Sequence, residues 1–212
     1  MDNNSQRQII ISIGRAFGSG GHEIGRRLAD FYGIKLYDRE LVDMLAAQLN
    51  KDPRQIEQME EKVIGKLFPG LQKNAFSDHD RILMDKMSQS DRMFLIEKKI
   101  IQNLAETESF VIVGRAANAI LEGYPNTLRL YIYASDEFRI ERIRRIYNLD
   151  SDQKAKKMME DTDRSRREYF QYYTDMIWAS SDGHDASVKS SSFGLDQTLE
   201  IIKEMVHYKL GV

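Results

Sequence analysis

The feature that most constrains the fold is an apolar run that ends in a glycine-rich turn and leads into a helical pattern. The run is QIIISI at residues 8–13, and Gly14, Gly18, Gly20 and Gly21 follow it. Helical spacing continues at Ile24, Leu28 and Phe31. A short β-branched run is typical of a buried strand, and apolar residues three or four apart indicate an amphipathic helix. The stretch therefore predicts a strand, a tight turn and a helix.

Further apolar runs predict more strands, with helices between them. The predicted strands are IKLYD at 34–38, FVIVG at 110–114, LRLYIYA at 128–134 and ASVKSS at 186–191. Helical patterns lie at about 93–104, 136–147, 152–173 and 195–208, with two more after Asp38 and over 52–67. Strands that alternate with helices form parallel sheets covered on both faces, so we expect a three-layer α/β fold. Such sheets bind ligands at the carboxyl ends of their strands, where the glycine turn falls.

The glycine turn has the chemistry of an anion site. Its backbone N–H groups can point inward without interference from a Cβ, and the following helix adds its positive end. The nucleotide-binding pattern G-x-x-x-x-G-K-[ST] nevertheless has lysine where this chain has Gly21. Two other interpretations remain open: a turn without a ligand, and a dinucleotide site in which Asp38 is the acidic residue. His22 either contacts a phosphate when protonated or is an exposed histidine at a helix start.

The composition limits the possible partners. The chain has 212 residues with 31 basic and 33 acidic side chains, a formal charge of −2. This balance gives no global field for nucleic acid or an anionic membrane, so we expect neither partner. Cysteine is absent, the start MDNNSQRQ is polar, and no apolar run approaches a membrane span. We therefore expect a cytoplasmic globular protein, and the sequence assigns no oligomeric state.

Three arginine-bearing segments follow the predicted strands. GRAANAIL at 114–121 puts Arg115 at the carboxyl edge of the sheet, where its guanidinium could hold a phosphate bidentately. RIERIRR at 139–145 puts Arg142 and Arg145 three residues apart on a helix. DRSRREYFQYY at 163–173 puts Asp163, Arg166 and Tyr169 on one side of the next helix. Taken singly, each segment is more often a solvated surface than a binding site.

Taken in order, these segments resemble the cytidylate kinase-like family of P-loop nucleoside monophosphate kinases. The resemblance is carried by ISIGRAFGSGGHEIGRRLA, YDRELV, FVIVGRAANAIL, RIERIRR and TDRSRREYFQYYT, from about residue 9 to 178. It implies one P-loop kinase domain over 1–212 with a central parallel sheet flanked by helices. It also implies a core at about 8–38, 96–135 and 176–212, a helical monophosphate-binding insertion at about 39–95 and a lid at about 136–175.

The resemblance also implies roles for individual residues. The glycine loop would cradle the donor phosphates through Gly18, Ser19, Gly20, Gly21 and His22. Asp38, Arg115, Asp163 and Arg166 match the residues that hold the acceptor monophosphate. ATP and Mg²⁺ are the implied cofactors, CMP or dCMP is the implied acceptor, and we assign no residue as a metal ligand.

The chain departs from the family pattern at two positions. Gly21 replaces the lysine, and Ala116 stands where the main cytidylate kinase line has aspartate after Gly-Arg. Removing one preorganised donor from such a site typically costs about 3–4 kcal/mol of transition-state stabilisation. We therefore hypothesise that Arg15, Arg142 and Arg145 supply the missing charge as catalytic residues. A nucleotide-binding regulatory protein without transferase activity, and a kinase for another small-molecule acceptor, remain as alternatives.

Overall fold

The computed structural model describes residues 8–38 and 87–212. The chain divides into two compact units, one made of Met1–Asp38 with Ser109–Val212 and the other of Arg39–Glu108. In the second unit the described helix is α6, Gln89–Thr107, which begins at Ser88, whose hydroxyl accepts a hydrogen bond from the Asp91 N–H. The helices expected after Asp38 and over 52–67 lie outside the described residues, as does most of the expected insertion at 39–95.

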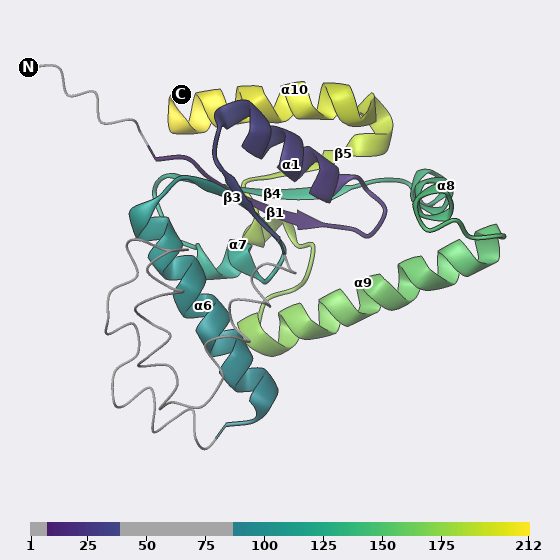
Figure 1. Cartoon of the computed structure of the whole chain (residues 1–212), viewed down its shortest axis with the longest axis horizontal. Helices are drawn as coiled ribbons and strands as arrows, with labels where there is room; N and C mark the ends of the chain where they lie inside the picture. The colour runs from purple at the N-terminus through teal and green to yellow at the C-terminus, as the bar shows by residue number, and fades with distance from the viewer. Residues whose placement is uncertain (1–7, 39–86) are drawn as a thin grey trace, which may run out of the picture. The chain divides into compact units, whose positions relative to one another are not determined.

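A parallel sheet forms the centre of the first unit, as the sequence predicts. Its strands are β1 (Ile10–Arg15), β2 (Lys35–Tyr37), β3 (Phe110–Val113), β4 (Thr127–Tyr133) and β5 (Ala186–Lys189). In the described residues they are ordered β2-β3-β1-β4-β5, and every neighbouring pair is parallel (Figure 1). β1 therefore lies between two strands that come much later in the chain. This is the switch point at which parallel sheets open a crevice at their carboxyl edge.

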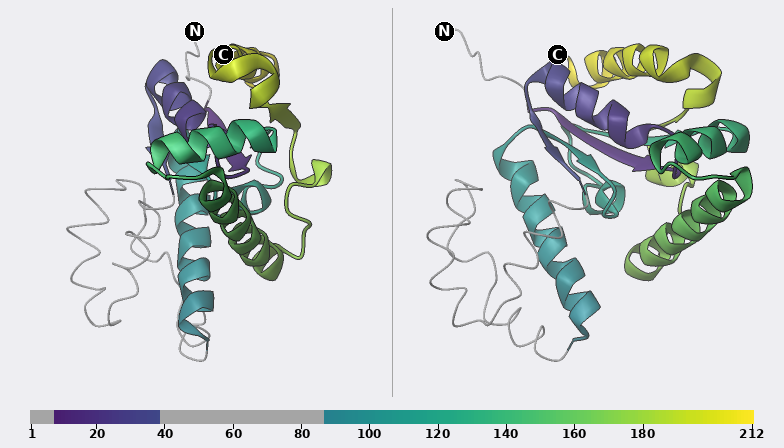
Figure 2. Two further views of the ribbon diagram at one scale, coloured as in Figure 1. Left: turned by 90° about the vertical axis from the view of Figure 1, so that its right-hand side faces the viewer. Right: turned by 45° about the vertical axis from the view of Figure 1, so that its right-hand side comes forward.

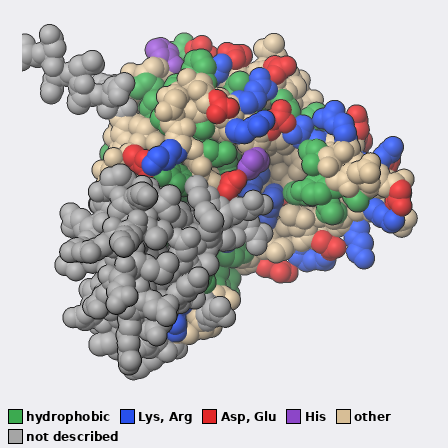
Figure 3. Space-filling view, in the orientation of Figure 1, with side chains coloured by type: hydrophobic (Ala, Val, Ile, Leu, Met, Phe, Trp, Pro, Cys, Tyr) green, Lys and Arg blue, Asp and Glu red, His purple; other side chains and the backbone are tan. Residues whose placement is uncertain are grey.

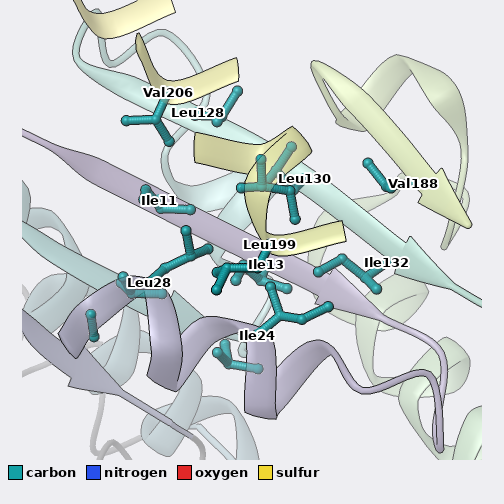
Figure 4. Close-up of a cluster of buried hydrophobic side chains, with 14 of the residues drawn as sticks. Ile11, Ile13, Ile24, Leu28, Leu128, Leu130, Ile132, Val188, Leu199 and Val206 are labelled. Atoms are coloured by element: carbon teal, nitrogen blue, oxygen red, sulfur yellow. The ribbon is translucent and has the colours of Figure 1, made fainter. Parts of the chain in front are cut away.

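Helices cover both faces of the sheet. α1 (Gly21–Tyr32) and α10 (Ser190–Leu210) lie on one face, and the short α7 (Ala117–Ile120) lies on the other (Figure 1). Side chains from α1 and α10 meet those of the strands in one core (Figure 4), which includes Ile11, Ile13, Ile24, Leu28, Leu130, Leu199 and Val206. Each of these aliphatic side chains is almost fully buried, a contribution of about 1.5–3 kcal/mol apiece. The core fixes α1 against β1, and so fixes the turn between them.

A helical hairpin follows β4. α8 (Asp136–Ile146) begins at Ser135 and α9 (Asp152–Thr174) begins at Ser151, each with its serine hydroxyl accepting a first-turn N–H. The two helices lie side by side (Figure 2) over a small apolar cluster made of Ile143, Ala155 and Met159. The hairpin spans most of the residues expected to form the lid, at about 136–175, and the lid role itself stays a prediction. After it the chain passes through a short 3₁₀ turn, η2 (Ser181–Gly183), into β5.

α10 begins at Ser190, with a break at Gly194, whose φ of 74° and ψ of 166° are not helical. The regular part of the helix therefore starts near residue 195, as predicted. None of the helices in the described ranges is both long enough and apolar enough to span a membrane.

Candidate active site at the carboxyl edge of the sheet

The glycine turn between β1 and α1 has the shape of an anion-binding loop. Gly18 and Gly20 have φ values of 81° and 85°, a left-handed conformation that glycine adopts without strain. Gly20 is the N-cap of α1, and in the described part of the chain no side chain caps this helix end. The amides of the first turn of α1 therefore keep their capacity to bind an anion at the positive end of the helix.

Hydrogen bonds hold the loop in this shape from inside. The Ser19 hydroxyl donates to the Ala16 carbonyl at 2.8 Å. The Ser190 hydroxyl lies within hydrogen-bonding distance of two carbonyl oxygens, Ser19 at 2.7 Å and Tyr133 at 3.1 Å. Ser19 and Ser190 are both fully buried. These bonds join the loop to the end of β4 and the start of α10, and fixing the loop in this way is the preorganisation that an anion site needs.

The helical hairpin clamps the same loop at Phe17. The Phe17 N–H donates to Asp163 Oδ1 at 2.8 Å, and Arg139 Nε donates to the Phe17 carbonyl at 2.7 Å. Arg139 also forms an ion pair with Asp163 Oδ2 and another with Asp136 at 3.2 Å. Arg139 and Asp163 are largely buried. Both peptide groups of Phe17 are thus held by charged side chains from α8 and α9.

This clamp involves one residue that the sequence interpretation missed. Arg139 lies in the RIERIRR segment, one turn before Arg142 on the same helix, so its position was visible but its burial was not. Asp163, expected at the acceptor, directs its two carboxylate oxygens to Phe17 and Arg139. Its position supports a role in holding the loop.

The two predicted α8 arginines have different surroundings. Arg142 forms an ion pair with Glu23 in the first turn of α1, and its side chain is mostly buried. Arg145 lies in the last turn of α8 and is exposed. The structure therefore brings Arg142, but not Arg145, to the start of α1.

Arg15, the last residue of β1, lies between Gly21 at the start of α1 and Gly114 after β3. A Cβ on Gly21 would lie 2.7 Å from Arg15 Cβ and 3.2 Å from its Cγ. A Cβ on Gly114 would lie 3.0 Å from Arg15 Cζ and closer still to Nη1. The stem of Arg15 thus rests on Gly21 and its guanidinium on Gly114, and both contacts exclude any larger residue without movement.

The turn after β3 brings the second predicted arginine to this edge. Gly114, Arg115 and Ala116 have φ values of 88°, 58° and 52°, so three successive residues are left-handed. For non-glycine residues this conformation costs of order 1–3 kcal/mol each and persists only where surrounding structure holds it. The Arg115 guanidinium lies over the Tyr169 ring of α9, 5.5 Å from its centroid.

Arg166 of α9 approaches the end of β1 from the hairpin. Its Nη1 donates to the Arg15 carbonyl at 3.3 Å, and its guanidinium lies 5.3 Å from the centroid of the Phe17 ring. Arg15 and Arg166 therefore meet at the end of β1, with the Arg115 turn beyond Gly114.

His22 and Asp38 form a pair beside the loop. His22 Nε2 donates to Asp38 Oδ2 at 3.1 Å, joining the first turn of α1 to the end of β2. His22 remains more than half exposed. His22 occupies the position where the nucleotide-binding pattern has serine or threonine.

A cluster of aromatic side chains, which the sequence interpretation did not anticipate, packs against β1 at Gly14. Tyr131 of β4 packs against Trp178 and His184, with ring centroids 5.6 and 5.3 Å apart. Burial raises the pKa of Tyr131, and the nearby Asp163 carboxylate adds to the rise. Burial also lowers the pKa of His184, whose Nδ1 donates to the Ser180 carbonyl at 2.8 Å. Both side chains are therefore predominantly neutral near pH 7.

Acidic and basic side chains are interspersed on the face of the described residues seen in Figure 3, in keeping with the near-balanced charge of the whole chain. The positive charge that matters for an anion is local, at the edge where Arg15, Arg115 and Arg166 lie.

Comparison with known proteins identifies the family to which this site belongs. The model of the cytidylate kinase-like family matches residues 10–192. A crystal structure of an uncharacterized protein from Eubacterium ventriosum is 27% identical with a TM-score of 0.71, covering 94% of this chain and 98% of the other. More distant is a shikimate kinase from Acinetobacter baumannii, at 14% identity and a TM-score of 0.49, covering 94% and 93% of the two chains. No curated protein matches the chain.

Proposed function

This chain belongs to the cytidylate kinase-like family and has the P-loop kinase fold, and we propose that it transfers the γ-phosphoryl group of ATP to a nucleoside monophosphate. CMP or dCMP is the proposed acceptor, on the strength of the family resemblance. The products would be ADP and the nucleoside diphosphate.

The observation that carries this proposal is the meeting of two anion-binding features at one sheet edge. The loop at Gly18–Gly20 and the start of α1 suit the phosphates of a donor. The turn at Arg115 presents a guanidinium suited to an acceptor phosphate. Arg15 extends from the first feature to the second. Phosphoryl transfer needs this kind of arrangement, because positioning and charge neutralisation supply most of its catalysis.

The residues present are compatible with Mg²⁺ that arrives with the nucleotide. Among the described residues no group of three or more histidine and carboxylate side chains could hold a metal. Mg²⁺ in kinases is commonly held by one or two carboxylates together with substrate phosphates and water. Asp38, paired with His22 beside the loop, is the carboxylate we propose for this role. The ion would neutralise charge on the donor phosphates.

The residues of the chain would have separate roles in binding and positioning the two substrates. The α1 amides bind the donor phosphates, and the buried serine bonds keep those amides in place. Arg115 holds the acceptor phosphate, while Arg166 keeps the end of β1 in position. The α8–α9 hairpin fixes Phe17 and so fixes the loop between the two substrates. Each role is one of orientation or charge, and none requires a covalent intermediate.

The His22–Asp38 pair favours one alternative, a hydroxyl acceptor instead of a monophosphate. A carboxylate that accepts from one imidazole nitrogen leaves the other free to act as a general base. A hydroxyl must lose a proton during transfer, whereas an ionised phosphate acceptor need not.

A panel assay tests these possibilities. Nucleoside monophosphates and the corresponding nucleosides are incubated with ATP, Mg²⁺ and the protein, and ADP release is measured. We expect turnover with CMP or dCMP, and a rise in KM for the monophosphate in Arg115→Ala. The exposed α1 residue Arg26 provides the matched control, Arg26→Ala, with unchanged kinetics. Turnover with nucleosides alone would support the hydroxyl alternative, and ATP binding without turnover would support a regulatory protein.

A further inference from the structure

Two positions of the glycine turn depart from the nucleotide-binding pattern, and they touch each other. With Gly21 at the lysine position, the first glycine of the pattern, six residues earlier, falls on Arg15. The pattern has glycine at its first position and lysine directly before the closing serine or threonine, whereas this chain has arginine at the first of these positions and glycine at the second. A Cβ on Gly21 would lie 2.7 Å from Arg15 Cβ, so the side chain present at one position occupies space required by the other.

We propose that Arg15 is the cation of this phosphate loop, and that Arg15 and Gly21 are a reciprocal exchange of the usual glycine and lysine. The inference rests on the proposed function, and it assigns the positive charge of the missing lysine to a single residue, Arg15. The guanidinium, placed on Gly114, lies between the donor loop and the Arg115 turn. A positive charge at this place would act on a phosphoryl group that moves from the loop to the Arg115 turn.

The other two arginines fit this role less well. Arg142 is directed to Glu23 in the first turn of α1, and Arg145 is exposed at the end of α8. The surrounding residues hold Arg15 along its whole length. Gly21 leaves space for its aliphatic stem, Gly114 leaves space for its guanidinium, and Arg166 donates a hydrogen bond to its carbonyl. Gly114 has a φ of 88°, which favours glycine, and it has no Cβ in the space that the guanidinium occupies.

The exchange makes a specific prediction about paired substitutions. Arg15→Gln keeps a long polar side chain and removes the positive charge. Arg15→Gly removes the whole side chain that contacts Gly21 and Gly114. Gly21→Lys alone places a second stem against Arg15, and overpacking of this kind should lower Tm by about 2–12 °C. Arg15→Gly combined with Gly21→Lys restores the usual order of glycine and cation. The double variant should therefore be more stable than Gly21→Lys and more active than Arg15→Gly.

The decisive readout is binding of ATP compared with binding of AMP, measured by titration calorimetry alongside thermal melts. The usual lysine reaches the β- and γ-phosphates, so AMP lacks the groups with which the cation interacts. Arg15→Gln should weaken ATP binding about 10- to 100-fold and leave AMP binding within about twofold. If Arg15→Gln loses the same affinity for ATP and for AMP, the role of Arg15 is merely structural. With an acceptor that the wild-type protein uses, the rate of phosphoryl transfer by Arg15→Gln should fall by about two to three orders of magnitude.

The outcomes separate this inference from the proposed function. Recovery of ATP binding in the double variant supports the exchange, even if wild-type protein transfers phosphate to no acceptor in the panel. The inference is overturned if Arg15→Gln binds ATP as tightly as wild type. It is also overturned if the folded double variant binds ATP no better than Arg15→Gly. Should the double variant fail to fold, the ATP-to-AMP ratio of Arg15→Gln decides the question.

Discussion

The clamp on Phe17 allows a quantitative test of how the hairpin supports the phosphate loop. Asp163→Asn keeps the shape of the side chain and removes the charge opposite Arg139. Arg139 would then be largely buried without its main partner, retaining Asp136 at 3.2 Å and the Phe17 carbonyl at 2.7 Å. Breaking a buried pair typically costs about 3–5 kcal/mol. The retained contacts place the expected loss at the lower end, about 3 kcal/mol.

This loss can be measured by thermal and urea denaturation. For a chain of this size, about 3 kcal/mol corresponds to a fall in Tm of about 6–12 °C. Asp161→Asn is the matched control, because Asp161 lies on the same helix and forms an ion pair with Arg164 at the surface. A pair of this kind contributes about 0–1 kcal/mol. If Asp163→Asn is no less stable than Asp161→Asn, the hairpin does not anchor the loop and the reasoning fails.

Three other substitutions test separate parts of the account. Ser190→Ala removes a buried hydroxyl that lies near two carbonyl oxygens. The free energy of unfolding should fall by about 1–3 kcal/mol in urea titrations, and the affinity for ATP should also fall. An unchanged urea midpoint would contradict the preorganisation of the loop. Gly25→Ala places a Cβ 2.8 Å from Val113 Cγ2, and overpacking should cost about 1–3 kcal/mol, seen as a lower Tm. The pKa of His184 is lowered by burial, so the unfolded chain binds its proton more readily; stability should decrease as pH falls through about 6.5. Melts at pH 7.5 and 5.5 should show a smaller decrease in His184→Asn, and an equal decrease would assign the effect to other groups.

The sequence predicted the strands and the loop because their signals are local. β-branched runs between turn residues mark β1, β3 and β4, and Gly18 and Gly20 supply the left-handed conformation that the turn requires. The predicted three-layer fold is confirmed. The short helix α7 was not expected, because four residues are too few for a periodic pattern. Strand order also has no local signal, since it depends on which strands pair across long separations.

The interior of the site was harder to predict for the same reason. Several arginines lie within RIERIRR, and only the packing of α8 against α9 and the loop decides that Arg139 is buried while Arg145 is exposed. Likewise, the contact of Arg15 with Gly21 and Gly114 depends on the adjacency of β1 and β3. The residue types were visible in the sequence, but their partners come from the tertiary structure. The individual site roles therefore stay predictions that the variants above can test.

We propose above that the loop and the Arg115 turn together direct the transfer of a phosphoryl group between two nucleotides. The most direct measurement follows ATP and CMP with Mg²⁺ by phosphorus NMR in the presence of the wild-type protein. ADP and CDP should appear in equal amounts, and neither should form when CMP is omitted. Binding of ATP and CMP with no CDP formed, under conditions where a known nucleotide kinase produces it, would contradict the claim.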